Sequence, residues 1–330
     1  MTTTLTAPIT TCAAESDSIS ILTVMMGGSV GIHVRPVDDG HTSTAQAERT
    51  ARSTLHRLQV WADRLSRFRA TSDLVRLNAA PAARVPVSAT LAAVLDWARQ
   101  AESLSGGIVD VTLLDARLDA ESAIPRTAGP ASDRPTDRSW SMDRMARDTF
   151  IRRAPGLRLD IDGVAKGWLA DRALARLSAF PAAVVDADGD IAIRLDAGRR
   201  WRFGVADPRT TQTDLVELDL VGPVGRGDGS RGGTFGLATS GTSVHRWLHD
   251  GRADHHLIDP RTGRPADTDV TQATVLARTA REAETLAKTA VILGSKAALE
   301  RLAGAKVEGA ILLTDTGHVL LTPGTERWLA

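Results

Sequence analysis

The stretch that most restricts the fold of this chain is residues 157–171, which read LRLDIDGVAKGWLAD. The residues before Gly163 predict a strand, and those after it predict a helix that runs to about Ser178. A helix N-terminus presents unpaired N–H groups and a partial positive charge, which suit a phosphate group. The turn by itself leaves two interpretations open, a nucleotide site and a purely structural strand-to-helix connection.

A second informative stretch, residues 236–266, reads GLATSGTSVHRWLHDGRADHHLIDPRTGRPA. Its DPRTG segment predicts a turn, because proline fixes φ near the start and glycine accepts a positive φ at the end. Adjacent histidines on a strand point to opposite faces, so only one of His255 and His256 can enter a given pocket. Each histidine taken alone could equally be a structural, hydrogen-bonded residue.

Together, ATSG, HHLIDPRTGRPA and LDIDGVAKGWLAD resemble the signature of the ApbE family, the FAD:protein FMN transferases. Enzymes of this family move FMN from FAD onto a Thr or Ser of a target protein. The family's LDLGGIAKGYAVD lies over residues 159–171 almost residue for residue. The resemblance spans about residues 20–325 and implies an α+β fold, a single domain of mixed β-sheets with packed helices.

The resemblance also assigns roles in the nucleotide site. Asp160 would contact the nucleotide, the Gly163 carbonyl would face the metal, and Lys166 would meet the FAD. The segment IVDVT at residues 108–112 is similar to the family's G-x-(F/L/M)-D-(V/I/P)-T. It implies that Ile108, Val109 and Asp110 line the adenine end. Read locally, Asp110 is either a turn residue or a buried acceptor that needs donors, because an unpaired buried carboxylate is costly.

Two motifs near the N-terminus are implied to meet the flavin. Residues 19–35 predict two strands around a Met26–Gly27–Gly28 turn, where the family has Met-Gly-Thr with the Met touching the flavin nucleotide. Phe68, in LSRFRATSDLVRLNAA, stands where the family usually has a flavin-contacting Tyr. It keeps the ring and lacks the hydroxyl. The alternative for Phe68 is that it packs inward at a helix terminus.

The loop that follows the histidines supplies the remaining implied site residues. His256 aligns with the family's motif histidine and is the candidate general base, since imidazole can titrate near neutral pH. Ile258 would pack on the nucleotide. Lys166 and Lys288 would stabilise charge during the reaction.

The predicted helix Ala280–Leu293 holds the clearest departure from the family. Counted back from Gly294, the family's magnesium-binding Asp, optional acid and Thr correspond to Glu284, Ala287 and Lys288. Magnesium prefers oxygen ligands and gains nothing from an ammonium group. Either the metal shifts toward Glu284 and the Gly163 carbonyl, or the site works without it. Locally, Glu284 and Lys288 could instead form an exposed i,i+4 pair worth roughly 0.2–0.5 kcal/mol.

The scarcity of lysine supports a site role for this pair. Of the 40 basic residues only Lys166, Lys288, Lys296 and Lys306 are lysine. A lysine inside a motif of such an arginine-rich chain is less interchangeable with other basic residues than it would otherwise be.

The expected reaction is attack of an acceptor hydroxyl on the FMN phosphorus of FAD, with AMP leaving. The expected partners are FAD and an acceptor flavoprotein that carries a Ser/Gly-Ala-Thr type target motif. Two alternatives remain. The chain could be a non-catalytic FAD-binding protein in which Lys288 is a permanent counter-ion, or an FAD pyrophosphatase that uses water as acceptor.

Composition and the lack of long apolar runs argue against several other classes of function. Lys+Arg and Asp+Glu both total 40, so net charge gives no support to a nucleic-acid or membrane-surface role. No apolar run approaches the roughly 20 residues that a membrane helix needs, and residues 1–18 do not read as a signal peptide. Cys12 is the only cysteine, which excludes an internal disulfide. A cytoplasmic location is expected.

The predicted domain boundaries are simple. Residues 1–18 are expected to be disordered, because they are rich in Thr, Ser and Ala, and 19–330 form the ApbE-like domain. Two flexible excursions are expected within it. The first spans about 116–141, and the second, about 222–233, is expected to form a long hairpin tip.

Overall fold

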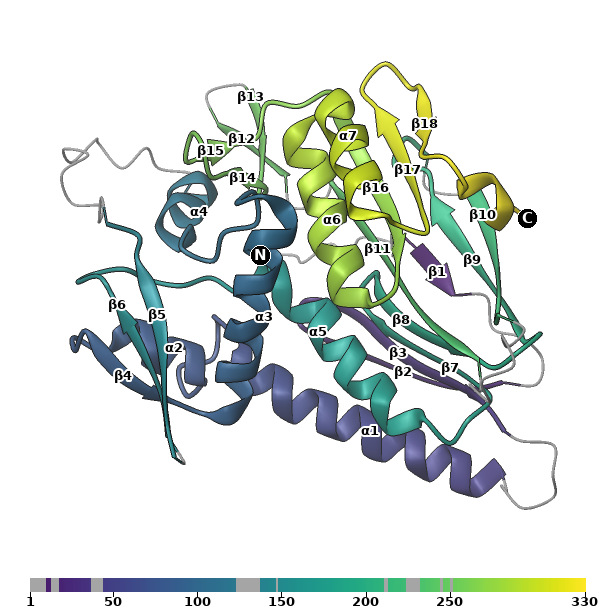
Figure 1. The fold of residues 1–330 in the computed structure, drawn as a ribbon, viewed down its shortest axis with the longest axis horizontal. Helices are drawn as coiled ribbons and strands as arrows, with labels where there is room; N and C mark the ends of the chain where they lie inside the picture. Colours follow the sequence, from purple (N-terminus) through teal and green to yellow (C-terminus); the bar gives the residue numbers. More distant parts are fainter. Residues whose placement is uncertain are drawn as a thin grey trace.

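An eight-stranded antiparallel sheet carries the fold (Figure 1). The computed structural model describes residues 10–12, 18–36, 44–122, 137–146, 148–210, 213–223, 232–243, 246–249 and 252–330. The strand order in the sheet is β18-β17-β16-β11-β8-β7-β3-β2. The strands are β2 (Ile19–Met25), β3 (Gly28–Arg35), β7 (Ala182–Ala187), β8 (Asp190–Leu195), β11 (Gly233–Gly241), β16 (Val270–Ala277), β17 (Gly309–Thr314) and β18 (Val319–Leu321).

The two faces of this sheet are covered differently. A three-stranded sheet of β1 (Thr10–Cys12), β9 (Arg200–Ala206) and β10 (Asp214–Val221) packs on one face. Helices α1 (Thr44–Leu65), α5 (Asp162–Leu174) and α6 (Ala280–Leu293) pack on the other. Alternation along β7 explains both layers, since Ala182 and Val184 pack with Trp201 of β9, whereas Ala183 and Val185 pack under the helices.

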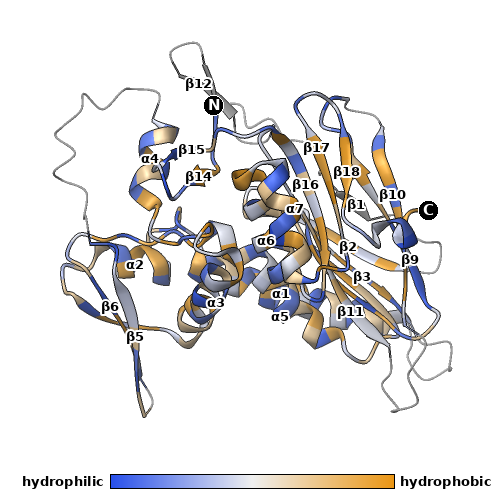
Figure 2. Ribbon diagram, turned by 45° about the horizontal axis from the view of Figure 1, so that its top comes forward, coloured by the Kyte–Doolittle hydropathy of each residue, from blue (hydrophilic) through white to orange (hydrophobic). Residues whose placement is uncertain are grey.

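A smaller unit stands beside the helices. It contains α2 (Asp73–Ala79), α3 (Ala89–Ser105) and a three-stranded sheet of β4 (Arg84–Val87), β6 (Asp148–Arg153) and β5 (Trp140–Met145). Its core joins the helices of the large sheet, because Leu95 of α3 and Ile151 of β6 share one apolar cluster with Val164 of α5. Figure 2 shows the hydrophobic residues gathered where these layers meet.

Short elements complete the chain (Figure 1). Helix α4 (Leu114–Glu121) lies beside two small hairpins, which pair β12 (Arg246–His249) with β13 (Arg252–His255) and β14 (Ile258–Asp259) with β15 (Arg264–Pro265). Helix α7 (Ser295–Ala305) packs on α6, and the 3₁₀ turns η2 (Ala175–Leu177) and η3 (Thr325–Trp328) follow α5 and β18.

The contact between α5 and α6 explains part of the 157–171 motif. A Cβ at Gly167 would lie 2.6 Å from the Ala280 carbonyl oxygen, so glycine lets the two helices approach closely. The Asp171 carboxylate accepts hydrogen bonds from the N–H groups of Ala280 and Arg281. It therefore satisfies two N–H groups in the first turn of α6, whose N-cap is Thr279.

Most sequence-based expectations for the elements are confirmed. The α+β class is confirmed, and the sheets expected to be mixed are antiparallel at every pairing of the described strands. The two strands at 19–35, the strand at 270–277 and the helix Ala280–Leu293 lie where expected. In the part of the chain that the structure describes, no helix is long and apolar enough to cross a membrane.

Three expectations about loops and termini are corrected. The excursion expected at 116–141 begins with α4 and ends in β5, and residues 123–136 lie outside the described residues. The segment 222–233 does not close a hairpin, because β10 pairs with β9 whereas β11 pairs with β8 and β16; residues 224–231 are not described. Within the expected disordered 1–18, Thr10–Cys12 form β1 on the free edge of β9. Each correction depends on a distant partner that local periodicity does not reveal.

Candidate functional site

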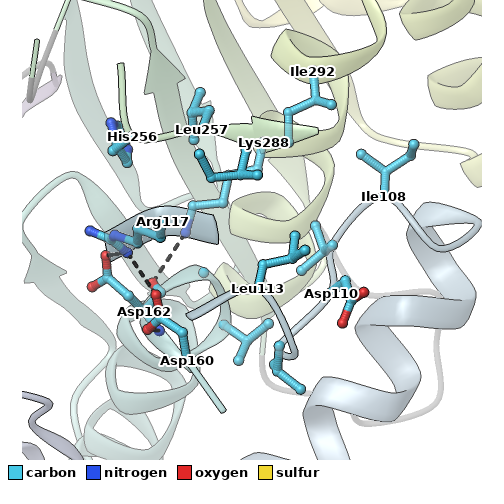
Figure 3. Close-up of a pocket in the computed structure, with 15 residues that line it drawn as sticks. Ile108, Asp110, Leu113, Arg117, Asp160, Asp162, His256, Leu257, Lys288 and Ile292 are labelled. Carbon is cyan, nitrogen blue, oxygen red and sulfur yellow. Dashed lines mark hydrogen bonds and ion pairs between the residues drawn. The ribbon is translucent and has the colours of Figure 1, made fainter. Parts of the chain in front are cut away.

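A cleft lies where five segments meet (Figure 3). They are the loop after α3, helix α4, the N-terminus of α5, the loop after β13, and α6. The lining residues are Ile108, Val109, Asp110, Val111, Leu113, Arg117, Asp160, Asp162, Gly163, Val164, His256, Leu257, Ile258, Lys288 and Ile292. Eight of the residues named from the sequence are among them: Ile108, Val109, Asp110, Asp160, Gly163, His256, Ile258 and Lys288.

Arg117 is the main functional side chain that sequence reasoning missed. Its Nη1 lies 3.1 Å from Asp160 Oδ2 and 2.5 Å from Asp162 Oδ2, and its side chain is only 11% exposed. Its Nε donates to Glu121 Oε1 at 2.8 Å, and Glu121 also accepts two hydrogen bonds from Arg67. The one local signal was the i,i+4 spacing of Arg117 and Glu121, which was hidden in a segment interpreted as an excursion.

The two aspartates beside Arg117 have different electrostatic environments. Burial, followed by the charge of Asp162, raises the pKa of Asp160. Burial also opposes ionisation of Asp162, but the positive charges of Arg117, Lys288 and Lys166 outweigh it and hold the pKa of Asp162 below its usual value. Asp162 is therefore the firmly charged carboxylate of the pair.

The segment 157–161 that carries Asp160 is not in a strand, so the strand predicted before Gly163 is wrong. The segment is held by Asn78 of α2. The Asn78 amide donates to the Leu159 carbonyl at 2.8 Å and accepts from the Leu159 N–H at 2.8 Å. This paired contact gives a positioning role to the asparagine that closes the SDLVRLN motif, whose Ser72 forms the N-cap of α2. The motif therefore supports the cleft from outside it.

Asp110 combines the two roles that the sequence left open. Its Oδ1 accepts from the N–H and the hydroxyl of Thr112, at 2.8 and 2.6 Å, which makes it a turn residue. Its Oδ2 accepts from Arg138 Nη1 at 3.1 Å. The carboxylate also lines the cleft, so the turn and a contribution to the cleft are compatible.

The adjacent histidines diverge as expected. His255 is buried, with Nε2 3.1 Å from the Ala266 carbonyl oxygen and Nδ1 accepting from the Leu257 N–H, so it fixes the loop. His256 lines the cleft instead. The DPRTG turn that follows is closed by the Gly263 N–H donating to the Asp259 carbonyl at 2.8 Å, and Gly263 has a φ of +68°.

Glu284 and Lys288 form a buried pair, so the interpretation as an exposed surface pair is wrong. Lys288 Nζ lies 3.1 Å from Glu284 Oε1 and 3.2 Å from the Asp162 carbonyl oxygen, and the dashed line in Figure 3 marks the contact with Asp162. The other carboxylate oxygen of Glu284 accepts from the Gly167 N–H at 3.0 Å. Burial, aided by the charge of Asp190, raises the pKa of Glu284 to about 7, although Lys288 opposes this shift.

The residues at this position do not fit a divalent metal ion. The Lys288 ammonium already contacts Glu284 and the backbone of Asp162, the residue before Gly163. Magnesium demands near-octahedral oxygen ligands at about 2.0–2.1 Å, and a lysine supplies none. Within the described residues, no group of three or more His, Cys, Asp and Glu side chains could hold a metal ion.

Four residues named from the sequence are not among those that line the cleft: Glu284, Lys166, Met26 and Phe68. Lys166 Nζ lies 3.2 Å from Asp190 Oδ2 and 3.6 Å from Asp188 Oδ2. Met26 forms the β2–β3 turn with a φ of +56°. Phe68 is 81% exposed, with the Arg67 guanidinium 4.3 Å from its ring centroid, so the alternative that it packs inward is wrong.

Gly28, which stands where the family has threonine, lies against the same region. A Cβ at Gly28 would overlap the Asp188 carboxylate, which in turn pairs with Lys166. The β2–β3 turn therefore lies against the Asp188–Gly189–Asp190 turn. In that turn the Gly189 N–H donates to Asp186 Oδ1 at 2.8 Å.

Comparison with known proteins gives a consistent result for sequence and fold. A protein of Haemophilus influenzae named FAD:protein FMN transferase is 27% identical over 305 residues, which cover 88% of this chain and 84% of that protein. The ApbE protein of Thermotoga maritima superposes with a TM-score of 0.75 at 19% identity, covering 95% of this chain and 99% of that chain. The apo form of the Pseudomonas stutzeri flavinyl transferase ApbE gives 0.70 at 20% identity, covering 94% and 96%.

At these identities the two solved structures show a shared fold alone. The sequence evidence goes further, because a model of the ApbE family matches residues 26–311, which include all five segments of the cleft. The chain therefore belongs to the ApbE family.

Proposed function

We propose that this protein is an FAD:protein FMN transferase, which moves FMN from FAD to a Thr or Ser hydroxyl of a target flavoprotein and releases AMP. The observation that carries the proposal is the cleft itself. It brings Asp110, Asp160 and His256, from three motifs far apart in the chain, to one surface together with Lys288. The name of the Haemophilus influenzae relative supports the same activity.

The lining of the cleft supports binding of an elongated nucleotide. Ile108, Val109 and Ile258 offer apolar surface, and Asp110 and Asp160 offer carboxylates to polar groups of the nucleotide. Lys288 and Arg117 supply positive charge beside the N-terminus of α5, which suits a pyrophosphate. Met26 and Phe68 lie outside the cleft lining. Their contacts with the flavin are proposed from the family resemblance alone.

In the proposed reaction the acceptor oxygen attacks the FMN phosphorus. A new P–O bond forms to the acceptor, and the bond from that phosphorus to the bridging pyrophosphate oxygen breaks. AMP leaves with the bridging oxygen. The acceptor hydroxyl gives its proton to His256, the proposed general base. Catalysis of this kind depends mainly on positioning and on neutralising charge, for which Lys288 and Lys166 are proposed.

A non-catalytic FAD-binding protein is the second candidate. Lys288 forms a pair with Glu284 and carries a fixed positive charge at the cleft. Such a permanent counter-ion would hold a pyrophosphate without promoting its cleavage. A cytoplasmic location remains a prediction for either candidate.

The test incubates the purified protein with FAD and a target domain that carries a Ser/Gly-Ala-Thr motif, with and without magnesium. We expect AMP release and an acceptor mass increased by FMN. A target whose acceptor Thr is replaced by Val is the matched control and should stay unlabelled. AMP release without labelling would identify a pyrophosphatase, and tightly bound, intact FAD would identify a binding protein.

A further inference from the structure

The cation at the α5–α6 junction is a side chain of the protein. We propose that the Lys288 ammonium takes the place of a divalent metal ion in this chain, so that the cleft engages the pyrophosphate of FAD through a built-in cation and works without magnesium. The pyrophosphate part of this inference rests on the proposed function. The metal-free part rests on geometry alone.

The first argument is the position of the ammonium group. Lys288 Nζ lies 3.1 Å from Glu284 Oε1 and 3.2 Å from the Asp162 carbonyl oxygen. It lies 3.6 Å from where a Cβ of Gly163 would stand. The ammonium therefore occupies the space between Glu284 and the N-terminal turn of α5, which is where the family resemblance places the metal.

The second argument is the number of donors. An ammonium group has three N–H donors, and Lys288 has two acceptors within hydrogen-bond distance among the described residues. Its side chain is 13% exposed and lines the cleft, so a further donor can face a ligand there. A phosphate oxygen is a suitable acceptor for a lysine acting as a point charge.

The third argument is that the surroundings hold this cation in place. Glu284 is fully buried, and its Oε2 is already occupied by the Gly167 N–H. A metal ion entering beside the ammonium would meet a like charge at short range, and one oxygen of the Glu284 carboxylate is already committed to the Gly167 N–H. Turning Lys288 away would leave the buried carboxylate unpaired, which is unfavourable.

The first experiment needs no variant. We measure FAD affinity by fluorescence quenching in EDTA and in magnesium, and we measure Mn²⁺ binding by the EPR signal of the free ion. We expect equal FAD affinity in both buffers and no stoichiometric Mn²⁺ binding. FAD affinity that requires magnesium, or one tightly bound Mn²⁺ per chain that magnesium displaces, would overturn the proposal.

The second experiment separates a ligand-facing cation from a structural ion pair. In the double variant Glu284→Gln with Lys288→Met both charges are removed together, so no buried charge is left unpaired. We expect it to fold, as judged by its thermal transition, and to bind FAD about 10- to 100-fold more weakly. Unchanged affinity would show that Lys288 is structural only and would overturn its role toward the pyrophosphate.

Lys296 provides the matched control. It is an exposed lysine on α7, so Lys296→Met removes the same charge from the chain without touching the cleft. FAD affinity should stay within twofold of the wild type. An equal loss in this control would mean that net charge governs binding, and this would contradict a specific role for Lys288.

The outcomes for the two proposals can be told apart. If the wild type binds no FAD in either buffer, the proposed function fails, and with it the role of Lys288 toward a pyrophosphate. The Mn²⁺ measurement still decides whether the site is free of metal. If the wild type transfers FMN in EDTA, both proposals are supported together.

Discussion

Lys166 of α5 and Lys288 of α6 are two of the four lysines of the chain, yet their surroundings differ. Lys166 faces two carboxylates, Asp190 at 3.2 Å and Asp188 at 3.6 Å. Lys288 faces one carboxylate and a backbone carbonyl, and it lines the cleft. Because only Lys288 of the two lines the cleft, it is the lysine placed to meet a ligand there.

The electrostatics of the Lys166 cluster agree with this comparison. Burial by itself would lower the pKa of Lys166, but Asp190, Asp188 and more distant carboxylates raise it above its usual value. Asp186, two residues before Asp188, is so poorly solvated that burial raises its pKa to about 7. The ion pairs of Lys166 with Asp188 and Asp190 therefore link α5 to the β7–β8 turn.

The largest expected effect is that of Lys166→Met on stability. The substitution leaves Asp188 and Asp190 without their partner, so the free energy of unfolding should fall by about 3–5 kcal/mol. Urea denaturation measures this loss, and Lys166→Met with Asp190→Asn should recover part of it. A variant that folds normally and yet binds FAD poorly would break the comparison, because Lys166 would then act on the nucleotide.

Arg117→Lys should come next, with its main effect on FAD affinity. Lysine keeps the charge, but a single ammonium cannot bridge Asp160, Asp162 and Glu121 as the guanidinium does. We expect FAD affinity to fall about tenfold while the free energy of unfolding falls by about 1 kcal/mol. A large loss of stability with unchanged FAD affinity would show that Arg117 has a structural role and does not contact the ligand.

The variant Asp186→Asn tests whether the carboxylates around Lys166 outnumber it, because it changes how stability depends on pH. Because the pKa of Asp186 is raised to about 7, the folded protein binds a proton here more tightly than the unfolded chain. Its stabilising contribution is complete below the unfolded pKa and is lost as pH rises toward about 7. The variant lacks this loss, so its stability relative to the wild type should rise by about 1–2 kcal/mol between pH 5 and 7.5.

Thermal melts across that pH range provide the measurement for Asp186. Asparagine can still accept the Gly189 N–H through its side-chain oxygen, so the turn is preserved in the variant. Parallel pH profiles for the variant and the wild type would contradict the prediction.

Phe68→Ala should have the smallest effect on stability. The ring is 81% exposed, so the free energy of unfolding should change by less than about 0.5 kcal/mol. If Phe68 contacts the flavin, as the family resemblance implies, FAD affinity should fall while stability does not. Unchanged affinity would exclude Phe68 from the binding site.

The sequence by itself determined many of the local elements of this protein and much of its cleft. Strand β16 and helix α6 lie within the predicted ranges. They could be predicted because hydrophobic periodicity depends only on neighbouring residues, eight in the strand and fourteen in the helix. Motif order identified the family and placed Asp110, Asp160, His256 and Lys288 in one site. These inferences need only residue identity and spacing.

The tertiary structure alone decided burial and pairing. The Glu284–Lys288 spacing fits an exposed pair equally well, and it is buried because the Gly167 N–H, 117 residues away in the chain, reaches Glu284. Arg117 belongs to the site because α4 packs so that its guanidinium contacts Asp160 and Asp162, which local sequence does not predict. The physical reason is that desolvation and ion pairing depend on which distant segments meet, and no local pattern records that.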